Sequence, residues 1–340
     1  MSEITFYTVD LAKRVFQVHG YPRQGRRVLT RRLSRARFQG FFERDAQPGA
    51  TVVMEACGGA HFWGRWLRAR GFAPVLLPPR RVRAFVTGNK TDAADAEALA
   101  VAWRCGQLHP VPIKTETQQA IQLLHRLRER RLAARTAVSN QIRALLREYG
   151  VVAPAGAAAL SRTVAELRQA DAPLAPPVQA MLVDLVEEWH QLRASVARLD
   201  EQLTALYQTH EPCRRLGEIP GIGVVTATAL IAGVPDIQRF KRGRALAAWL
   251  GLTPKEHSSG DSRWLGGITK RGNTYLRTLL IHGARSAVRQ AHRRCDATSR
   301  WLQRLIQRRG HNCAVVALAN KNARIAWALL AHDVAYQPAC

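Results

Sequence analysis

The spacing of apolar residues changes near residue 113, and this change limits the chain to a mixed architecture. Before it, short apolar runs with strand-like alternation are interleaved with short helical segments. After it, apolar residues recur every three or four positions over long stretches, which is typical of packed helices. The sequence therefore predicts an α/β domain over residues 1–112, a helical coiled-coil or dimerisation region over 113–210 and a mainly helical C-terminal domain over 211–340.

The first 112 residues contain the signals of a single sheet with helices between its strands. Their order along the chain indicates an α/β domain with a mixed sheet. Strands are expected at residues 4–9, 15–19, 28–30, 51–54 and 73–77, and helices at 35–45 and 61–70.

Two long helices are expected at 115–149 and 178–210, on either side of an Ala/Pro-rich stretch at 151–177. The second helix carries an apolar seam of the kind that pairs helices in coiled coils and bundles. Dimerisation through this region is consistent with the seam but is not required by it. The seam residues are Met181, Leu182, Leu185, Val186, Trp189, Leu192, Val196, Leu199, Leu203 and Leu206.

The charge balance indicates the class of partner. The chain has 51 Lys and Arg against 25 Asp and Glu, a net charge of +26, which favours nucleic acid. Its six cysteines form no C-x-x-C pair, so neither a zinc site nor a disulfide framework is expected. No apolar run approaches the roughly 18 residues of a membrane span, and the N-terminus begins with a strand rather than a signal peptide. We therefore expect a cytoplasmic protein that associates with the nucleoid and not with membranes.

Acidic residues are scarce in the first hundred positions, so their placement is informative. Asp10 and Glu55 end apolar strands, and Asp92 and Asp95 lie three residues apart at an expected helix start, on one helix face. Four carboxylates in this context would supply the oxygen ligands that Mg²⁺ prefers. One or two bound Mg²⁺ ions could then assist phosphoryl transfer.

Each of these acids also has a structural explanation. Asp92 could cap the helix, Asp95 could pair with Lys90 or with the helix dipole, and Glu55 could pair with an arginine. The four acids taken together favour the metal site. Glu97 is a weaker candidate, because it lies one residue off the helix face.

Two features of the C-terminal part suggest contact with nucleic acid. The turn Gly221-Ile-Gly223 resembles a helix-hairpin-helix element, whose backbone N–H groups can hold a phosphate; a tight turn before a buried helix is the alternative. Residues 263–309 contain twelve Lys and Arg and a single acid, Asp296. The candidate nucleic-acid-binding residues are Gly221, Gly223, Arg263, Lys270, Arg271 and Arg277.

Three N-terminal motifs resemble those of the D-E-D-D transposases of bacterial insertion sequences, the insertion-sequence-110 family. They are Thr8-Val-Asp10-Leu-Ala-Lys13, Met54-Glu55-Ala-Cys-Gly58 and Lys90-Thr-Asp92-Ala-Ala-Asp95-Ala. The C-terminal half resembles the family's second conserved domain and is most similar to the insertion-sequence-1111 subgroup. The segments that carry this second resemblance are 219–227, 240–252, 258–260, 270–272 and 276–277.

The resemblance implies an RNase H-like (RuvC-like) N-terminal domain in which Asp10, Glu55, Asp92 and Asp95 are the catalytic, metal-binding acids. It also implies a helical coiled-coil region and a C-terminal transposase domain with a nucleophilic serine. Members of the family are similar to recombinases guided by a structured non-coding RNA, the bridge RNA. Four subunits assemble as a dimer of dimers, and the acids of one subunit act with the serine of another.

Two adjacent serines match the family's nucleophile. Ser258 and Ser259 lie in a polar segment, 257–261, that by itself is typical of a flexible turn. The family's pattern places the nucleophile immediately before glycine, so we expect Ser259 to act. Candidates to stabilise the developing phosphate charge, or to position the phosphate, are Arg263, Lys270 and Arg271.

The expected function is therefore cutting and rejoining of DNA through a covalent 5′-phosphoserine, with Mg²⁺ held by the four acids. A Mg²⁺-dependent, RuvC-like nuclease that resolves DNA junctions with water as nucleophile is one alternative. A non-catalytic nucleic-acid-binding protein is another, but it leaves the four acids unexplained.

Overall fold

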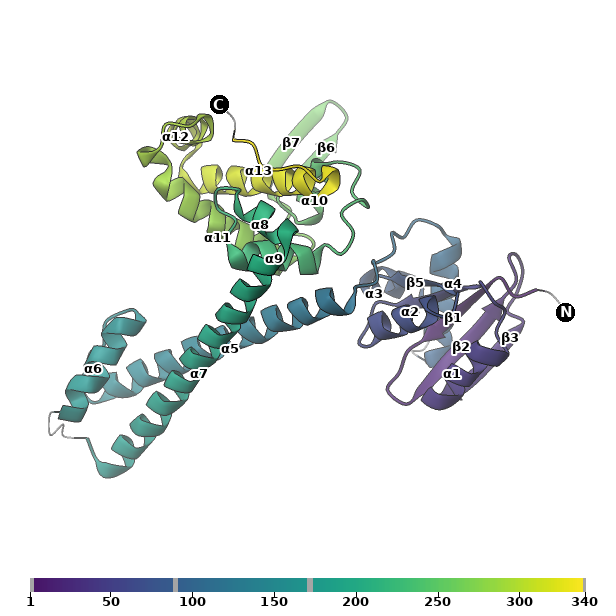
Figure 1. Cartoon of the computed structure of the whole chain (residues 1–340), viewed down its shortest axis with the longest axis horizontal. Coiled ribbons are helices and arrows are strands. Elements are labelled where there is room, and N and C mark those ends of the chain that lie inside the picture. The colour runs from purple at the N-terminus through teal and green to yellow at the C-terminus, as the bar shows by residue number, and fades with distance from the viewer. Residues whose placement is uncertain (1–2, 88–90, 170–173, 339–340) are drawn as a thin grey trace. The chain divides into compact units, whose positions relative to one another are not determined.

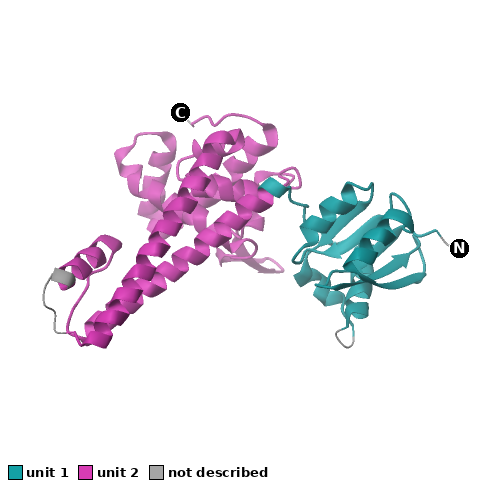
Figure 2. Ribbon diagram, turned by 60° about the horizontal axis from the view of Figure 1, so that its bottom comes forward, with its two compact units in different colours: residues 1–117 teal, residues 118–340 magenta. Residues whose placement is uncertain are grey.

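The computed structural model describes residues 3–87, 91–169 and 174–338, and the chain divides into two compact units (Figure 2). Unit 1 is Met1–Thr117 and unit 2 is Gln118–Cys340. The division into 1–112, 113–210 and 211–340 remains a prediction, because a compact unit is defined by its internal contacts and can contain more than one functional region.

Unit 1 is built on one five-stranded mixed sheet in the order β3-β2-β1-β4-β5 (Figure 1). The pairs β1–β2 and β2–β3 are antiparallel, whereas β1–β4 and β4–β5 are parallel. The expected mixed α/β sheet is thereby confirmed. Its elements are β1 (Phe6–Asp10), β2 (Val15–Tyr21), β3 (Leu29–Ser34), α1 (Arg35–Arg44), β4 (Thr51–Glu55), α2 (Ala60–Arg68), β5 (Ala73–Leu77), α3 (Pro79–Val82), the 3₁₀ turn η1 (Arg83–Phe85) and α4 (Asp92–Arg104).

Alternation along the central strands gives the sheet two buried faces. Tyr7 and Val9 of β1 pack in one apolar core with aromatic residues of α1 and α2. Phe6 of β1 and Val53 of β4 pack in a second core with α4. Because successive side chains of a strand point to opposite faces, Thr8 and Asp10 share the α4 face with Phe6.

Unit 2 begins with two long helices, α5 (Glu116–Glu148) and α7 (Pro176–Thr209), which confirm the expected helical region. A third helix, α6 (Ala157–Gln169), lies in the stretch for which the sequence predicted only a separating segment. Leu160 and Val164 of α6 are buried in a core with residues of α5 and α7. Their spacing of four and the surrounding alanines favour a helix, and the prolines of the stretch lie outside it.

The predicted apolar seam of α7 is used largely within the chain. Leu182, Val186, Trp189 and Leu192 pack in the core formed with α5 and α6, whereas Met181 is exposed. The seam therefore does not by itself supply a surface for a second subunit. Homo-oligomerisation remains a prediction from the family resemblance.

The rest of unit 2 is mainly helical and surrounds its own apolar core. The expectation of a flexible turn over 257–261 was wrong, because most of this segment belongs to an exposed two-stranded sheet. No helix in the described ranges is both long enough and apolar enough to cross a membrane. The elements are α8 (Glu211–Gly217), α9 (Val224–Gly233), α10 (Gly243–Trp249), β6 (Pro254–Ser259), β7 (Ser262–Ile268), α11 (Thr274–Gln290), the 3₁₀ turn η2 (Ala291–Arg293), α12 (Ala297–Arg309) and α13 (His311–His332).

Candidate active site

Asp10 and Glu55 end two adjacent parallel strands. The register pairs Val9 with Met54, so Asp10 and Glu55 are the next residues along β1 and β4. Thr8 and Val53 face α4, and Asp10 and Glu55 lie two positions after them on the same strands. Because alternate side chains of a strand point to the same face, Asp10 and Glu55 also point to the α4 face of the sheet. Burial raises the pKa of the neighbouring Cys57 thiol, and the charges of Glu55 and Asp10 raise it further.

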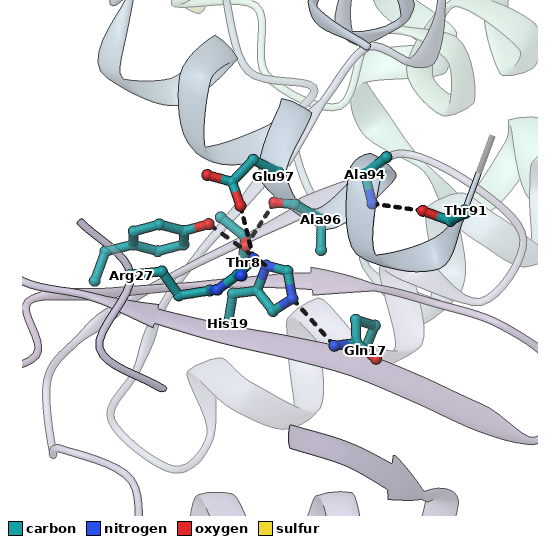
Figure 3. A network of polar contacts seen from close by, with 9 residues as sticks. Thr8, Gln17, His19, Arg27, Thr91, Ala94, Ala96 and Glu97 are labelled. Atoms are coloured by element: carbon teal, nitrogen blue, oxygen red, sulfur yellow. Dashed lines mark hydrogen bonds and ion pairs between the residues drawn. The ribbon is translucent and has the colours of Figure 1, made fainter. Parts of the chain in front are cut away.

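The other two acids lie in the first turn of α4. Thr91 caps this helix, its hydroxyl accepting a hydrogen bond from the Ala94 amide at 3.1 Å (Figure 3). Asp92 and Asp95 follow the cap, and a carboxylate in a first helical turn interacts favourably with the helix dipole.

The direction of α4 brings its first turn to the edge of the sheet that carries Asp10. Near its end, the Arg104 guanidinium lies 5.2 Å from the ring of Phe6, the first residue of β1. Further back along the helix, the Ala96 carbonyl accepts a hydrogen bond of 2.8 Å from Thr8 Oγ1. The helix thus runs opposite to β1, so its first turn, which carries Asp92 and Asp95, lies toward the ends of β1 and β4 that carry Asp10 and Glu55.

A polar network fastens α4 to this face (Figure 3). Arg27 Nη1 donates to Glu97 Oε2 at 2.7 Å and lies 3.3 Å from Nδ1 of the buried His19. Burial and then the Arg27 charge lower the pKa of His19 to about 4, against the opposing effect of Glu97. The ion pair gives Glu97 a structural role. Sequence reasoning missed Thr8 and Arg27 as positioning residues; strand alternation could have placed Thr8 beside Asp10, but no local signal identifies Arg27.

The four carboxylates do not form a completed metal site. Within the described ranges, no group of three or more His, Cys, Asp or Glu side chains is arranged to hold a metal ion. Their chemistry and their placement at one edge nevertheless fit a hard divalent cation with oxygen ligands. Lys90, considered above as a partner of Asp95, lies outside the described residues.

The two candidate serines lie on β6 of the exposed hairpin, in unit 2. Ser258 pairs with Arg263 and Ser259 with Ser262 across the strands, and Gly260 makes the turn with φ +54°. The Ser258 hydroxyl donates to Glu256 Oε1 at 3.0 Å, and Arg263 Nε donates to the same oxygen at 2.9 Å. Ser258 is therefore held within the hairpin, and the side chain of Ser259 is exposed at its tip.

Among the other predicted basic residues, Arg277 differs from Lys270 and Arg271. Its side chain is buried, and Nη1 donates to the Leu250 and Arg271 carbonyls, each at 3.0 Å. Both carbonyls belong to segments at the base of the serine hairpin. This position favours a structural role over the predicted contact with nucleic acid, whereas Lys270 and Arg271 are exposed.

The two glycines of the predicted phosphate-binding turn have different surroundings. Gly221 has φ +92°, and a Cβ there would come within 2.8 Å of the Gly283 carbonyl oxygen of α11. Gly223 precedes α9 as its N-cap, and a Cβ there would meet no atom within 4 Å. Close packing explains Gly221, and only Gly223 presents an open turn.

Comparison with known proteins defines the class of this chain. A family model described as the transposase IS116/IS110/IS902 family matches residues 213–300, and the transposase model for the DEDD proteins of IS110 matches residues 8–151. These matches cover both the acids and the serine hairpin, and they define a DNA transposase.

Full-length relatives agree with both matches. A protein of Pseudomonas aeruginosa named "Probable family 20 transposase" is 46% identical over 97% of this chain and 98% of its own length. The transposase of insertion sequence element IS1111A from Coxiella burnetii is 41% identical over 99% of this chain and 92% of its own. The chain belongs to the IS116/IS110/IS902 family of transposases, and family membership implies DNA binding and the use of a divalent metal.

Proposed function

We propose that this transposase cuts and rejoins DNA with two sets of residues, the acids Asp10, Glu55, Asp92 and Asp95 and the nucleophile Ser259. The observation that carries the proposal is that Asp10 and Glu55 end adjacent parallel strands and that the first turn of α4, with Asp92 and Asp95, lies toward the same strand ends. This placement, in a mixed five-stranded sheet, also supports the RNase H-like assignment that the resemblance implies.

In this mechanism Asp10, Glu55, Asp92 and Asp95 would hold one or two Mg²⁺ ions. Bound Mg²⁺ would stabilise the charge that develops on the phosphate oxygens. In a protein of net charge +26, four carboxylates brought to the DNA without a metal ion would repel the phosphates that the rest of the surface attracts.

The Ser259 oxygen attacks phosphorus, so that an Oγ–P bond forms and the P–O3′ bond breaks. The serine hydroxyl loses its proton and the leaving 3′ oxygen gains one, which gives a 5′-phosphoserine and a free 3′-hydroxyl. Attack by a 3′-hydroxyl of the partner DNA reverses these changes and restores Ser259. Each phosphodiester is exchanged for another, so the reaction requires no ATP. Both serines are exposed, and the internal hydrogen bond of the Ser258 hydroxyl to Glu256 supports the choice of Ser259 as nucleophile.

The partners proposed with this function are the element ends, the target DNA and a structured guide RNA. A dimer of dimers would allow the acids of one subunit to act with Ser259 of another. The protein would act in the cytoplasm, at the nucleoid.

The nucleophile is tested by trapping the covalent adduct. Purified protein is incubated with labelled element-end DNA, target DNA, guide RNA and Mg²⁺, and adducts that survive denaturation are resolved by electrophoresis. Ser259→Ala should abolish the adduct and leave DNA binding intact, and Ser258→Ala should retain it. An adduct that persists in Ser259→Ala and disappears in Ser258→Ala would overturn the assignment; cleavage without any adduct would support the water-dependent nuclease.

The acids are tested with a matched pair on one helix. Asp95→Asn should remove Mg²⁺-dependent cleavage, whereas Glu97→Gln should retain it, because Glu97 is paired with Arg27 and is half exposed. Asp10→Asn should behave like Asp95→Asn. Full cleavage by both Asn variants would refute the metal site and, together with Mg²⁺-independent binding, would favour a non-catalytic protein.

A further inference from the structure

A concave basic surface lies in unit 2 and is lined by residues outside the serine hairpin. We call it the α13 groove; it has a volume of about 670 Å³ and is lined by residues at the start of α10, on α12 and along α13. Figure 1 labels these three helices. Its size falls in the range of sites that bury small organic groups. The residues that matter here are Arg242, Arg244, Trp301, Lys321, Arg324 and Trp327.

The charge of the groove is entirely positive. Four of its lining residues are Arg or Lys, and none is Asp or Glu. Across the described part of the chain, none of these four side chains forms an ion pair with an acid. Cationic side chains gathered in a concavity focus a positive potential, which attracts a polyanion. Solubility alone does not require cations to be placed in a hollow.

The groove also contains two tryptophans. The indole nitrogen of Trp327 donates to the Phe240 carbonyl at 2.8 Å, which fixes that ring against the start of α10. The ammonium of Lys321 lies 5.2 Å from the centre of the Trp301 ring and donates to Thr298 Oγ1 at 3.1 Å. Both rings are partly exposed. Both rings also pack partly against the apolar core of unit 2, and their exposed parts lie in the same groove as cations that form no ion pair. Exposed aromatic surface in a basic groove suits a ligand with a flat base and a charged backbone.

The backbone around the groove is tightly packed, so the site is formed in advance. A Cβ on Gly243 would come within 3.0 Å of the backbone of Arg324, so α10 and α13 approach closely there. Asn320 Nδ2 donates to the Leu252 carbonyl at 3.1 Å and joins α13 to the segment after α10. A preformed site loses little conformational entropy on binding.

We propose that the α13 groove binds unpaired nucleotides of a polynucleotide strand, with the cations on phosphates and the tryptophans against bases. A regular duplex keeps its bases stacked inside and can offer only phosphates to such a site. This inference adds to the proposed function a surface that binds the nucleic acid. It rests on the proposed function for one point, that the partner is a nucleic acid. A single-stranded DNA and a structured RNA with unpaired loops share this chemistry.

Binding is measured in EDTA, which removes divalent metal ions and so prevents metal-dependent cleavage. The result therefore does not depend on whether the proposed metal site and the proposed nucleophile Ser259 are correct. Fluorescence anisotropy compares full-length protein with Arg242→Gln/Arg324→Gln and with Arg308→Gln/Arg309→Gln, which removes the same charge from exposed positions outside the groove. The probes are a labelled single-stranded DNA, a single-stranded RNA of the same sequence and the DNA duplex, each at several salt concentrations.

For the single strands, the groove variant should lose about tenfold in affinity and lower the salt dependence of log K by about 1.4, as expected for two phosphate contacts. The control variant should lose clearly less affinity for the single strands. For the duplex, the two variants should lose similar amounts of affinity. Ultraviolet crosslinking of a 5-iodouracil strand should recover peptides containing Trp301 or Trp327. The difference between the DNA and RNA arms then identifies the preferred strand.

Two results would overturn the proposal. Equal losses in the groove and control variants, for every probe, would mean that only overall charge matters. Crosslinks confined to peptides outside α10, α12 and α13 would place the strand elsewhere.

Discussion

Thr8 of β1 donates a hydrogen bond to the backbone carbonyl of Ala96 in α4, across 2.8 Å of the interior of unit 1. Thr8 lies two residues before Asp10, and Ala96 follows Asp95 directly. This single contact therefore connects the strand and the helix that carry three of the four proposed catalytic acids, and it fixes their relative position without involving any acid.

Thr8→Val keeps the shape of the side chain and removes this hydrogen bond. We expect a loss of about 1 kcal/mol in the free energy of unfolding, as is typical for one buried hydrogen bond. Cleavage should fall further than the folded fraction does, because α4 can then shift relative to Asp10. Thr204→Val, which removes a hydroxyl bonded to a helix carbonyl at an exposed position, should change neither quantity appreciably. Urea unfolding measures the stability, and single-turnover cleavage measures the rate. If Thr8→Val and the unchanged protein cleave at equal rates per folded molecule, the positioning role of Thr8 is contradicted.

Arg277 is expected to act in stability rather than in binding. Arg277→Met leaves the Leu250 and Arg271 carbonyls without a buried charged donor, and we expect it to destabilise unit 2 by about 3 kcal/mol. Arg271→Met, at an exposed position, should leave stability nearly unchanged and weaken DNA binding. Denaturant unfolding and binding titrations compare the two variants. A stable Arg277→Met protein with weakened binding would instead support direct contact with nucleic acid.

The two glycines of the 221–223 turn should respond differently to alanine. Gly221→Ala forces a Cβ toward the Gly283 backbone at a positive φ, and we expect it to cost at least about 2 kcal/mol of stability. Gly223→Ala meets open space and should cost about 1 kcal/mol or less, as an N-cap change does. Thermal unfolding of both variants is the measurement. Similar melting temperatures for the two would show that the contact with α11 is not tight.

Stability should decrease as the solution becomes acidic, partly because of His125. Its ring nitrogens lie 3.0 Å from the Tyr275 and Thr228 hydroxyls, and burial, with Arg128, lowers its pKa to about 4. The unfolded chain takes up this proton near pH 6.5, so stability is lost as the pH falls from about 6.5 toward 4 and is retained above. Between pH 7.5 and 5 the loss from this group should be about 2 kcal/mol.

The measurement is urea unfolding at pH 7.5 and pH 5. His125→Gln should reduce the difference in the free energy of unfolding between pH 7.5 and pH 5 by about 2 kcal/mol, whatever its effect on stability at pH 7.5. His292→Gln, at an exposed position, should leave the difference unchanged. An undiminished difference in His125→Gln would mean that the acid sensitivity arises elsewhere, with the buried His19 as the next group to test.

The sheet and the elements that carry the acids were predictable because they depend on local patterns. Strand alternation and the apolar runs ending at Asp10 and Glu55 predicted β1 and β4, and the segment with Asp92 and Asp95 predicted the start of α4, although Thr91 and not Asp92 caps that helix. What brings these elements together is less local. The Arg27–Glu97 pair spans 70 positions, and no short pattern indicates it.

The hairpin and the role of Arg277 could not be read from the sequence for similar reasons. Ser258, Gly260 and Asp261 are residues that favour turns, and pairing across β6 and β7 overrides that preference on either side of Gly260. Arginine at position 277 is formally one more positive charge in a basic stretch. Only the fold shows that it is buried and donates to the carbonyls of Leu250 and of the nearby Arg271.

The acids and the serine hairpin belong to different compact units of one chain. Under the proposed mechanism, neither unit contains a complete cutting centre, so a proteolytic fragment or a half-synthesised chain is chemically harmless. For a mobile element that must not break its host's chromosome at random, dividing the reactive groups in this way makes correct assembly a precondition of strand breakage.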